Sequence, residues 1–341
     1  MLIKKYENNP ILSPNPNNSW EDRCVLNPAV VYDEESKKFV MVYRAGGDEV
    51  RHVIRMGLAT SDDGIHFTRD SDKPVFESSQ VEADGGCVED PRIVKLGDAY
   101  YMTYAARCYA PGRYWLDLEN LSPMYLDETD VIADELPYFA KKNITVSYLA
   151  MTKDFKNYKR FGRITEATVD DRDVLLFPEK VNGKYVLVSR PKFKTDKVKM
   201  PSVWISFGDD LLEYDKPELL ITGEQWWETA RIGAGTPPIK TDKGWFMLYH
   251  GVDDKGIYRV GAILMDLNDP RKVIARTKDF LMQPELPYET EGLYDGCVFP
   301  TGNVVKDGVL YIYYGCADKH VSLATANFDE LVEYLATQCK L

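Results

Sequence analysis

The chain alternates short apolar runs with polar turns, and one pattern of this kind recurs five times. Each copy has a strand that starts at a proline, then a turn, then a strand rich in tyrosine, valine and methionine. Turns such as Asn182-Gly183 and Asp307-Gly308 between alternating runs are strong local signals for a β-hairpin. We therefore expect five hairpins, whose first strands begin at 27–32, 90–95, 177–181, 236–240 and 299–305.

A further strand follows each hairpin, and short fourth strands fit at 67–69 and 158–160. The matching place near the end of each second strand is held by Tyr43, Tyr104, Ser189, Tyr249 and Tyr314. Repeats of four strands are typical of propeller blades. We predict an all-β fold, a five-bladed β-propeller that occupies 1–341 as a single domain, with a short helix at 329–335.

The second copy contains a long insertion at about 108–142, rich in aromatic and acidic residues. Insertions in repeat folds map to loops on one face, which is often the binding face. The insertion is thus either a loop bordering a site or a surface excursion without function.

Composition is that of an ordinary globular protein, with 44% hydrophobic and 12% aromatic residues. The net charge of −12 argues against nucleic acid or an anionic membrane as a partner. The N-terminus lacks the apolar core of a signal peptide, and no segment is apolar for long enough to span a bilayer, so we expect a cytoplasmic protein. The six cysteines lack the spacing of a zinc site and are expected to be buried free thiols.

A candidate catalytic residue lies in the run from Cys87 to Arg92, where two adjacent acids precede Pro91. Proline disfavours helical geometry in the residue before it, so we expect Asp90 to be extended and held in a defined direction. Each copy has one residue directly before the proline that marks its first strand. In the five copies these residues are Asn27, Asp90, Phe177, Thr236 and Phe299. Asp90 is the one acid of that set and is our candidate catalytic acid; the alternative is a turn acid paired with Arg92.

Cations recur at the far end of the second strand, where the copies carry Arg44, Ala105, Arg190, His250 and Gly315. Arg172 and Arg231 are close to this position in sequence. Equivalent positions of propeller blades converge on the central channel, and clustered arginines bind phosphate well. For any single arginine, the alternative is a salt bridge within its blade.

One acid facing an anion pocket suits inverting phosphorolysis. Ordinary glycoside hydrolysis uses two carboxylates, whereas phosphate is already an anionic nucleophile and needs no base.

The motifs at 27–28, 43–45, 86–92, 173–180, 233–238, 248–252 and 313–318 make the chain similar to glycoside hydrolase family 130. Its members are β-mannoside phosphorylases and β-mannosidases built as five-bladed propellers. The resemblance covers nearly the whole chain. It implies inverting phosphorolysis of a β-1,2- or β-1,4-linked manno-oligosaccharide or of mannosyl-glucose, giving α-mannose 1-phosphate and a shortened sugar.

The resemblance also implies roles for individual residues. Asp90 would be the proton donor, acting through a hydroxyl of the mannose, and Asn27, Arg44 and Asp318 would lie near that mannose. The phosphate ligands would be Arg172, Arg190, Arg231 and His250, with Arg231 replacing a lysine common in the family. Hydrolytic members lose these cations and supply glutamate instead. The resemblance implies inorganic phosphate as co-substrate, with no metal and no organic cofactor.

Two other functions stay open at this point. One is a β-mannosidase that uses water, helped by a glutamate such as Glu89 or Glu179. The other is a propeller that only binds carbohydrate. A homo-oligomer is expected only because such assemblies are common among soluble enzymes.

Overall fold

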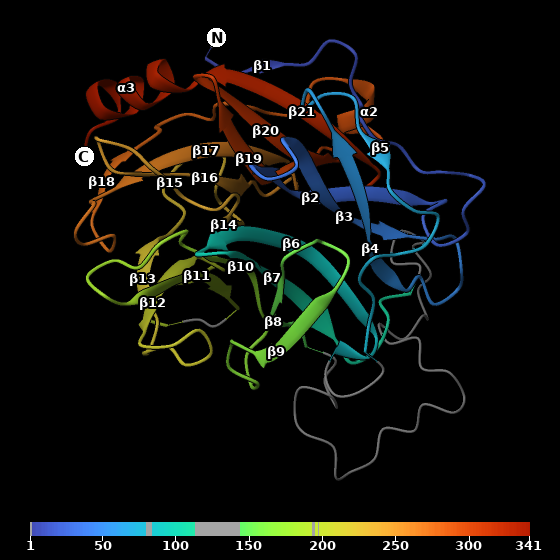
Figure 1. Cartoon of the computed structure of the whole chain (residues 1–341). Coiled ribbons are helices and arrows are strands. Elements are labelled where there is room, and N and C mark those ends of the chain that lie inside the picture. Colours follow the sequence, from blue (N-terminus) through green and yellow to red (C-terminus); the bar gives the residue numbers. More distant parts are fainter. Residues whose placement is uncertain (1, 80–83, 113–143, 193–194, 197) are drawn as a thin grey trace.

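Five small antiparallel sheets surround a common centre in the computed structural model of the chain (Figure 1). The structure describes residues 2–79, 84–112, 144–192, 195–196 and 198–341. The first strands of neighbouring sheets contact one another: β2 (Cys24–Asp33) touches β6 (Cys87–Leu96), and β6 touches β10 (Asp171–Leu176). This arrangement confirms the predicted five-bladed β-propeller. The predicted insertion at about 108–142 falls almost entirely outside the described residues.

The blades follow the order of the chain. Blade 1 consists of β2, β3 (Lys38–Gly46), β4 (Ile54–Ser61) and β5 (Thr68–Arg69). Blade 2 consists of β6, β7 (Ala99–Arg107), β8 (Val146–Thr152) and β9 (Tyr158–Arg163). Blade 3 consists of β10, β11 (Tyr185–Pro191), β12 (Val203–Gly208) and β13 (Glu218–Ile221). Blade 4 consists of β14 (Arg231–Ala234), β15 (Ile239–Lys240), β16 (Trp245–Val252), β17 (Tyr258–Met265) and β18 (Val273–Arg276).

Blade 5 joins the two ends of the chain. Its strands are β19 (Val298–Lys306), β20 (Val309–Cys316), β21 (His320–Asn327) and the N-terminal β1 (Lys4–Lys5). β1 pairs with β21 through Lys4 opposite Thr325. The repeat pattern did not indicate β1, because two residues are too few for an alternation to be visible.

The predicted hairpin turns are confirmed where the chain must enter left-handed geometry. Asn182 and Gly183 have φ of 50° and 81°, and Asp307 and Gly308 have 51° and 77°. Positive φ at both central residues is what a type I′ hairpin turn requires.

The predicted starts of two first strands were wrong. In blade 3 the strand is β10, which ends before Phe177, and in blade 4 it is β14, which ends before Thr236. The reason is that Pro178 and Pro237 lie beyond these strands, whereas Pro28 and Pro91 lie inside β2 and β6.

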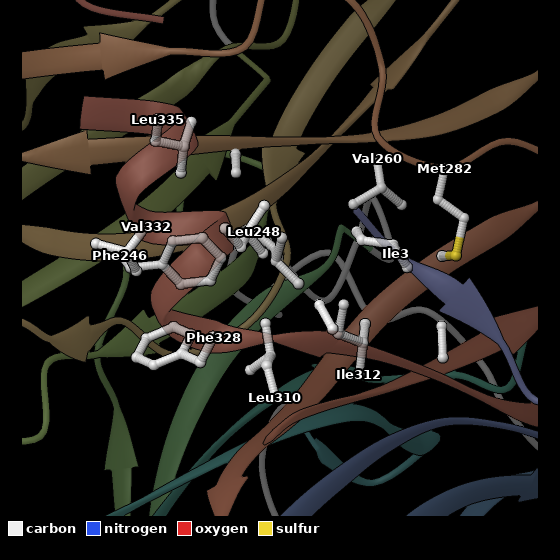
Figure 2. Close-up of a cluster of buried hydrophobic side chains, with 14 of the residues drawn as sticks. Ile3, Phe246, Leu248, Val260, Met282, Leu310, Ile312, Phe328, Val332 and Leu335 are labelled. Atoms are coloured by element: carbon white, nitrogen blue, oxygen red, sulfur yellow. The ribbon is translucent and has the colours of Figure 1, made fainter. Parts of the chain in front are cut away.

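Much of the core lies where blades 4 and 5 meet under α3 (Phe328–Gln338). Figure 2 shows Phe328, Val332 and Leu335 of this helix beside Phe246 and Leu248 of blade 4. Asn327 caps the helix by accepting a hydrogen bond from the backbone N–H of Glu330 at 3.0 Å. The predicted C-terminal helix is therefore confirmed, and it covers the core where blades 4 and 5 meet. A short second helix, α2 (Pro287–Thr290), precedes β19.

A buried tyrosine–carboxylate–cation triad recurs in four blades, at the tyrosines that the repeat pattern aligned. In each, the tyrosine hydroxyl donates to a carboxylate that also pairs with a cation. The triads are Tyr43–Glu21–Arg69, Tyr104–Asp84–Arg160, Tyr249–Glu228–Arg276 and Tyr314–Glu289–Lys5. Blade 3 has Ser189 at this place instead.

The structure also bears on the predictions about the cysteines and about membrane-spanning segments. All six cysteines are free thiols; five are buried and Cys108 is partly buried. In the part of the chain that the structure describes, no helix has the length and apolar character needed to cross a bilayer.

Candidate active site

The pairing of strands places the five positions that the sequence aligned at equivalent points of the five blades, each opposite a residue of the first strand. Arg44, Ala105, Arg190, His250 and Gly315 pair with Leu26, Glu89, Arg172, Gly233 and Phe299, respectively. The sequence alignment of this position is therefore confirmed. It also places Arg172 directly opposite Arg190 within blade 3.

In the first three blades, a β-bulge follows directly after the first-strand residue of this pair. Asn27, Asp90 and Asp173 stand in it with φ of 44°, 54° and 55°. The prediction that Pro91 holds Asp90 extended was wrong, because the bulge puts Asp90 in the left-handed region. Asn and Asp tolerate that region better than other side chains, and a bulge re-aims its side chain.

Asp90 lies at the centre of a polar cluster formed by blades 1 and 2. Its Oδ1 accepts a hydrogen bond from Asn27 Nδ2 at 2.8 Å and from Arg44 Nη1 at 2.9 Å. Arg92 donates to the backbone carbonyl of Asp90, not to its carboxylate, so the simple Asp90–Arg92 turn pair is not what forms. The Asp90 side chain keeps 13% of its surface exposed, which leaves it open to a ligand.

The charges around Asp90 favour its ionised form. Burial by itself raises the pKa of this carboxyl, but the charges of Arg44 and Arg92 outweigh burial and lower the pKa below its ordinary value. A proton donor at this place therefore needs a change in its surroundings before it can donate.

Of the two glutamates considered for a hydrolytic mechanism, Glu89 shares Arg44 with Asp90, whereas Glu179 lies away from it. Glu89 is buried and pairs with Arg44 at 2.9 Å and with Arg107 at 3.5 Å. Glu179 is exposed and pairs with Lys240, whose strand β15 lies opposite the beginning of β16, while His250 lies near the end of β16. The structure therefore does not bring Glu179 together with Asp90.

Asp173 is a functional candidate that the sequence reasoning missed. Its Oδ2 accepts a hydrogen bond from Arg190 Nε and lies 3.7 Å from His250 Nε2, and its Oδ1 lies 3.7 Å from Arg92 Nη2. Gly233 makes room for this contact, since a Cβ there would come within 2.3 Å of Asp173 Oδ2. The statement that Asp90 is the one acid at its repeat position was therefore wrong.

A signal for Asp173 was present in the sequence. The run Asp171-Arg172-Asp173 before an apolar strand resembles the acids before Pro91. The choice of proline as the marker hid it, because Val174 takes the place of proline in this bulge.

Arg172 and Arg231 are the accessible cations of the predicted phosphate set. Arg172 donates to Thr145 Oγ1 at 2.6 Å and pairs with Asp170 at 3.0 Å, with 21% of its side chain exposed. Arg231 is partly buried and donates to the Tyr258 hydroxyl at 2.6 Å. Burial opposes the charge of each, but Asp170 beside Arg172 and Tyr258 beside Arg231 raise the pKa of these arginines.

Burial disfavours the charged form of His250. Burial lowers its pKa to about 3, and the ring packs against Phe299 with centroids 4.7 Å apart. The prediction counted it among the cation-capable residues, but at neutral pH it is an uncharged ring that can only exchange hydrogen bonds.

Asp318 occupies the turn between β20 and β21 with φ of 50° and is partly buried. After burial, its charge is the next largest influence that raises the pKa of the Cys297 thiol, and Asp90 and Arg231 also act on that thiol. The predicted substrate residues Asn27, Arg44 and Asp318 thus lie around the same end of the propeller as Asp90.

The cluster as a whole combines the partly exposed carboxylate of Asp90 with arginines from adjacent blades. Asp90 is a group that can transfer a proton, and the arginines are groups that can bind an anion. Within the described ranges, no group of three or more His, Cys, Asp or Glu residues could hold a metal ion.

Comparison with known proteins places the chain among mannoside phosphorylases. A family model described as β-1,4-mannooligosaccharide phosphorylase matches residues 3–120 and 132–337. A 1,2-β-oligomannan phosphorylase of Thermoanaerobacter sp. (strain X514) is 37% identical over 335 residues, covering 96% of this chain and 98% of the relative. A β-1,4-mannooligosaccharide phosphorylase of Ruminococcus albus is 31% identical, covering 98% and 91%.

Solved structures agree with this comparison. A β-1,2-mannobiose phosphorylase from Listeria innocua, solved with β-1,2-mannobiose, superposes with a TM-score of 0.79 at 25% identity and covers 98% of this chain and 99% of that one. A second structure, from work on glycoside hydrolases that target β-1,2 mannosidic linkages in Candida mannan, superposes with a TM-score of 0.76 at 25% identity, covering 95% and 93%.

Proposed function

The chain belongs to glycoside hydrolase family 130, and from this membership we propose that it is an inverting β-mannoside phosphorylase. The reaction transfers a mannosyl group from a β-mannoside to inorganic phosphate, giving α-mannose 1-phosphate and a sugar shortened by one unit. Asp90 is the proton donor, and Arg172, Arg190 and Arg231 bind the phosphate, with His250 as an uncharged hydrogen-bonding neighbour.

The observation that carries this proposal is a continuous set of charged contacts from Asp90 to blade 3. Arg92 donates to the backbone carbonyl of Asp90 and lies 3.7 Å from Asp173, which accepts a hydrogen bond from Arg190. Arg172 and Arg190 are paired across β10 and β11, and Arg231 begins β14 in the next blade. Arginine forks match phosphate oxygens well, and several together compensate its charge. A site built only to bind neutral sugar would need neither this charge nor an acid.

Asp173, a further carboxylate of the cluster, does not favour hydrolysis by water. Asp173 is buried to 2% exposure; burial opposes its charge, but Arg190 and the neighbouring Arg92 lower its pKa well below the ordinary range. A carboxylate with so low a pKa is a weak base and would activate water poorly. Phosphate needs no such activation, which is why phosphorolysis fits this set of charges better.

Phosphate binding also accounts for how Asp90 can become a donor. The charges of Arg44 and Arg92 hold Asp90 ionised, and an incoming phosphate anion adds negative charge beside it. A like charge nearby raises the pKa of a carboxyl. The bound phosphate thus favours protonation of Asp90 before the glycosidic bond breaks, and the leaving sugar takes that proton.

We propose a β-1,2-linked manno-oligosaccharide as the substrate. Relatives named for β-1,2 linkages are 37%, 35% and 32% identical to this chain, compared with 31% for the β-1,4-mannooligosaccharide phosphorylase. These differences are small, so the linkage is the first thing to measure.

The test is incubation with β-1,2- and β-1,4-mannobiose, each with and without phosphate, following mannose and mannose 1-phosphate. Mannose 1-phosphate formed from β-1,2-mannobiose only when phosphate is present supports both proposals. Formation from β-1,4-mannobiose alone overturns the linkage. Free mannose formed at the same rate without phosphate overturns phosphorolysis and makes the protein a β-mannosidase.

A further inference from the structure

Asp173 is a negative charge placed inside a site that should attract anions. The bulge of β10 holds its side chain against Arg190, with Arg92 Nη2 and His250 Nε2 each 3.7 Å away. Neither proton donation nor activation of water requires it, since Asp90 supplies the proton and phosphate is the nucleophile. Its presence therefore calls for a separate physical reason.

The two oxygens of Asp173 have different surroundings. Oδ2 receives the hydrogen bond from Arg190 Nε, whereas no hydrogen bond from a described residue reaches Oδ1. On the facing side, Arg92 Nη2 also has no hydrogen-bond partner among the described residues. The site thus holds an acceptor and a donor side by side, each without a hydrogen bond of its own.

An acceptor carboxylate in an anion site distinguishes between anions by their protons. Inorganic phosphate still carries one or two protons near neutral pH, and a P–OH group can donate a short charge-assisted hydrogen bond to a carboxylate. Sulfate has the same shape and charge but no proton, so Asp173 would repel it. Rejection of a competitor by an unpaired charge is a common source of specificity.

We propose that Asp173 accepts a hydrogen bond from the protonated oxygen of phosphate and so makes the site select phosphate over sulfate. The inference rests on the proposed function, because it assigns a role within the phosphate site of the phosphorylase. Asp173 is then a specificity-determining residue with no part in proton transfer to the sugar.

The experiment compares phosphate with sulfate in the wild type and in Asp173→Asn. Asparagine keeps the shape and tolerates the positive φ, and its amide can donate a hydrogen bond to an unprotonated oxygen. We measure the KM for phosphate and the inhibition constant for sulfate, and expect their selectivity ratio to fall by a factor of about 10 or more. A ratio that stays constant in Asp173→Asn overturns the proposal, even if both anions bind more weakly.

A matched control separates the specific contact from general charge. Asp170→Asn removes a carboxylate that pairs with Arg172 from the other side. If Asp173 acts through the proton of phosphate, Asp170→Asn leaves the selectivity ratio unchanged. An equal loss of selectivity in both variants would mean that any lost negative charge has this effect, and would overturn the proposal.

The wild type alone also decides the matter if the variant fails to fold. Arsenate carries a proton as phosphate does, so it should replace phosphate as a substrate while sulfate inhibits weakly. Sulfate that inhibits the wild type as strongly as arsenate competes would overturn the proposal. The failure of the proposed function is distinguishable, because it appears as absence of mannose 1-phosphate, whereas calorimetric binding of phosphate and sulfate still measures the ratio.

Discussion

Two regions of this propeller bury charges at similar depth, yet they differ in how completely the charges are paired. In the blades, the carboxylate of each triad is satisfied by its own tyrosine and its own cation. Glu228, for example, accepts from Tyr249 at 2.6 Å and from Arg276 at 2.6 Å. At the centre, the side chains of Asn27, Arg92 and His250 keep buried polar atoms without a hydrogen bond from the described residues.

This difference shows that buried charge alone does not indicate function. A complete triad is a structural element, because its groups already exchange all the hydrogen bonds that burial demands. Buried polar groups without partners cost free energy, and a bound ligand can supply the missing partners. Such atoms also occur inside the blades, at the Tyr158 hydroxyl and at Trp227 Nε1, so those at the centre point to a ligand only because they lie beside Asp90 and Asp173. Substitutions at the central charges should therefore change activity, and substitutions in the triads should change stability.

The largest effect is expected for Asp90→Asn. Loss of the proton donor should lower kcat for phosphorolysis by a factor of about 100 to 10,000. The melting temperature should change little, since asparagine also tolerates the positive φ of this bulge. Steady-state rates of mannose 1-phosphate release measure the loss of kcat, and a thermal melt measures the stability. A variant that keeps more than a tenth of the activity would show that Asp90 is not the proton donor.

The reverse pattern is expected for Glu228→Gln in the blade 4 triad. A neutral amide in place of this carboxylate would leave the buried charge of Arg276 with only its longer, 3.5 Å contact to the exposed Glu224, which should lower the free energy of unfolding by about 3 kcal/mol. The KM for phosphate should stay as in the wild type. Urea denaturation measures the loss, with Asp209→Asn in the exposed Lys184–Asp209 pair as a control expected to change nothing measurable. A raised KM in Glu228→Gln would contradict the division into structural and functional charge.

Among the described residues of blade 3 no such triad is present, and the buried Asp171 of this blade provides a test that depends on pH. Asp171 accepts from the backbone N–H of Arg190, but burial dominates and raises its pKa to about 7. Because the folded pKa exceeds the unfolded one, the folded state binds more protons, and stability falls as pH rises from about 4 to about 7.

Asp171→Asn removes this titration. The variant should therefore gain about 2 kcal/mol relative to the wild type between pH 5 and pH 8. Urea denaturation at the two pH values measures the gain. A difference between variant and wild type that stays the same at both pH values would show that Asp171 is already ionised in the fold.

The sequence predicted those features that depend on local patterns. Five repeats of alternating strands and Gly-containing turns were sufficient for the propeller, and Arg44, Arg190 and His250 were correctly aligned across blades. Asp173 was missed because its bulge contains Val174, and a bulge is defined by pairing with β11, which a single strand does not reveal. The neutral state of His250 was also beyond the sequence, since it depends on burial beside Phe299.

The smallest effect is expected for replacement of Arg231, a partly buried cation of the centre. Arg231→Met removes the charge but keeps an apolar stem that can pack on Tyr258, where the guanidinium now lies 5.0 Å from the ring centroid. The KM for phosphate should rise about tenfold, which corresponds to about 1.4 kcal/mol. Arg231→Lys keeps the charge and should recover most of the loss, whereas an exposed cation replaced in the same way, Arg271→Met, should leave the KM unchanged. If Arg231→Met and Arg271→Met behave alike, the charge of Arg231 serves only its contact with Tyr258, and the anion site must be formed by blade 3 alone.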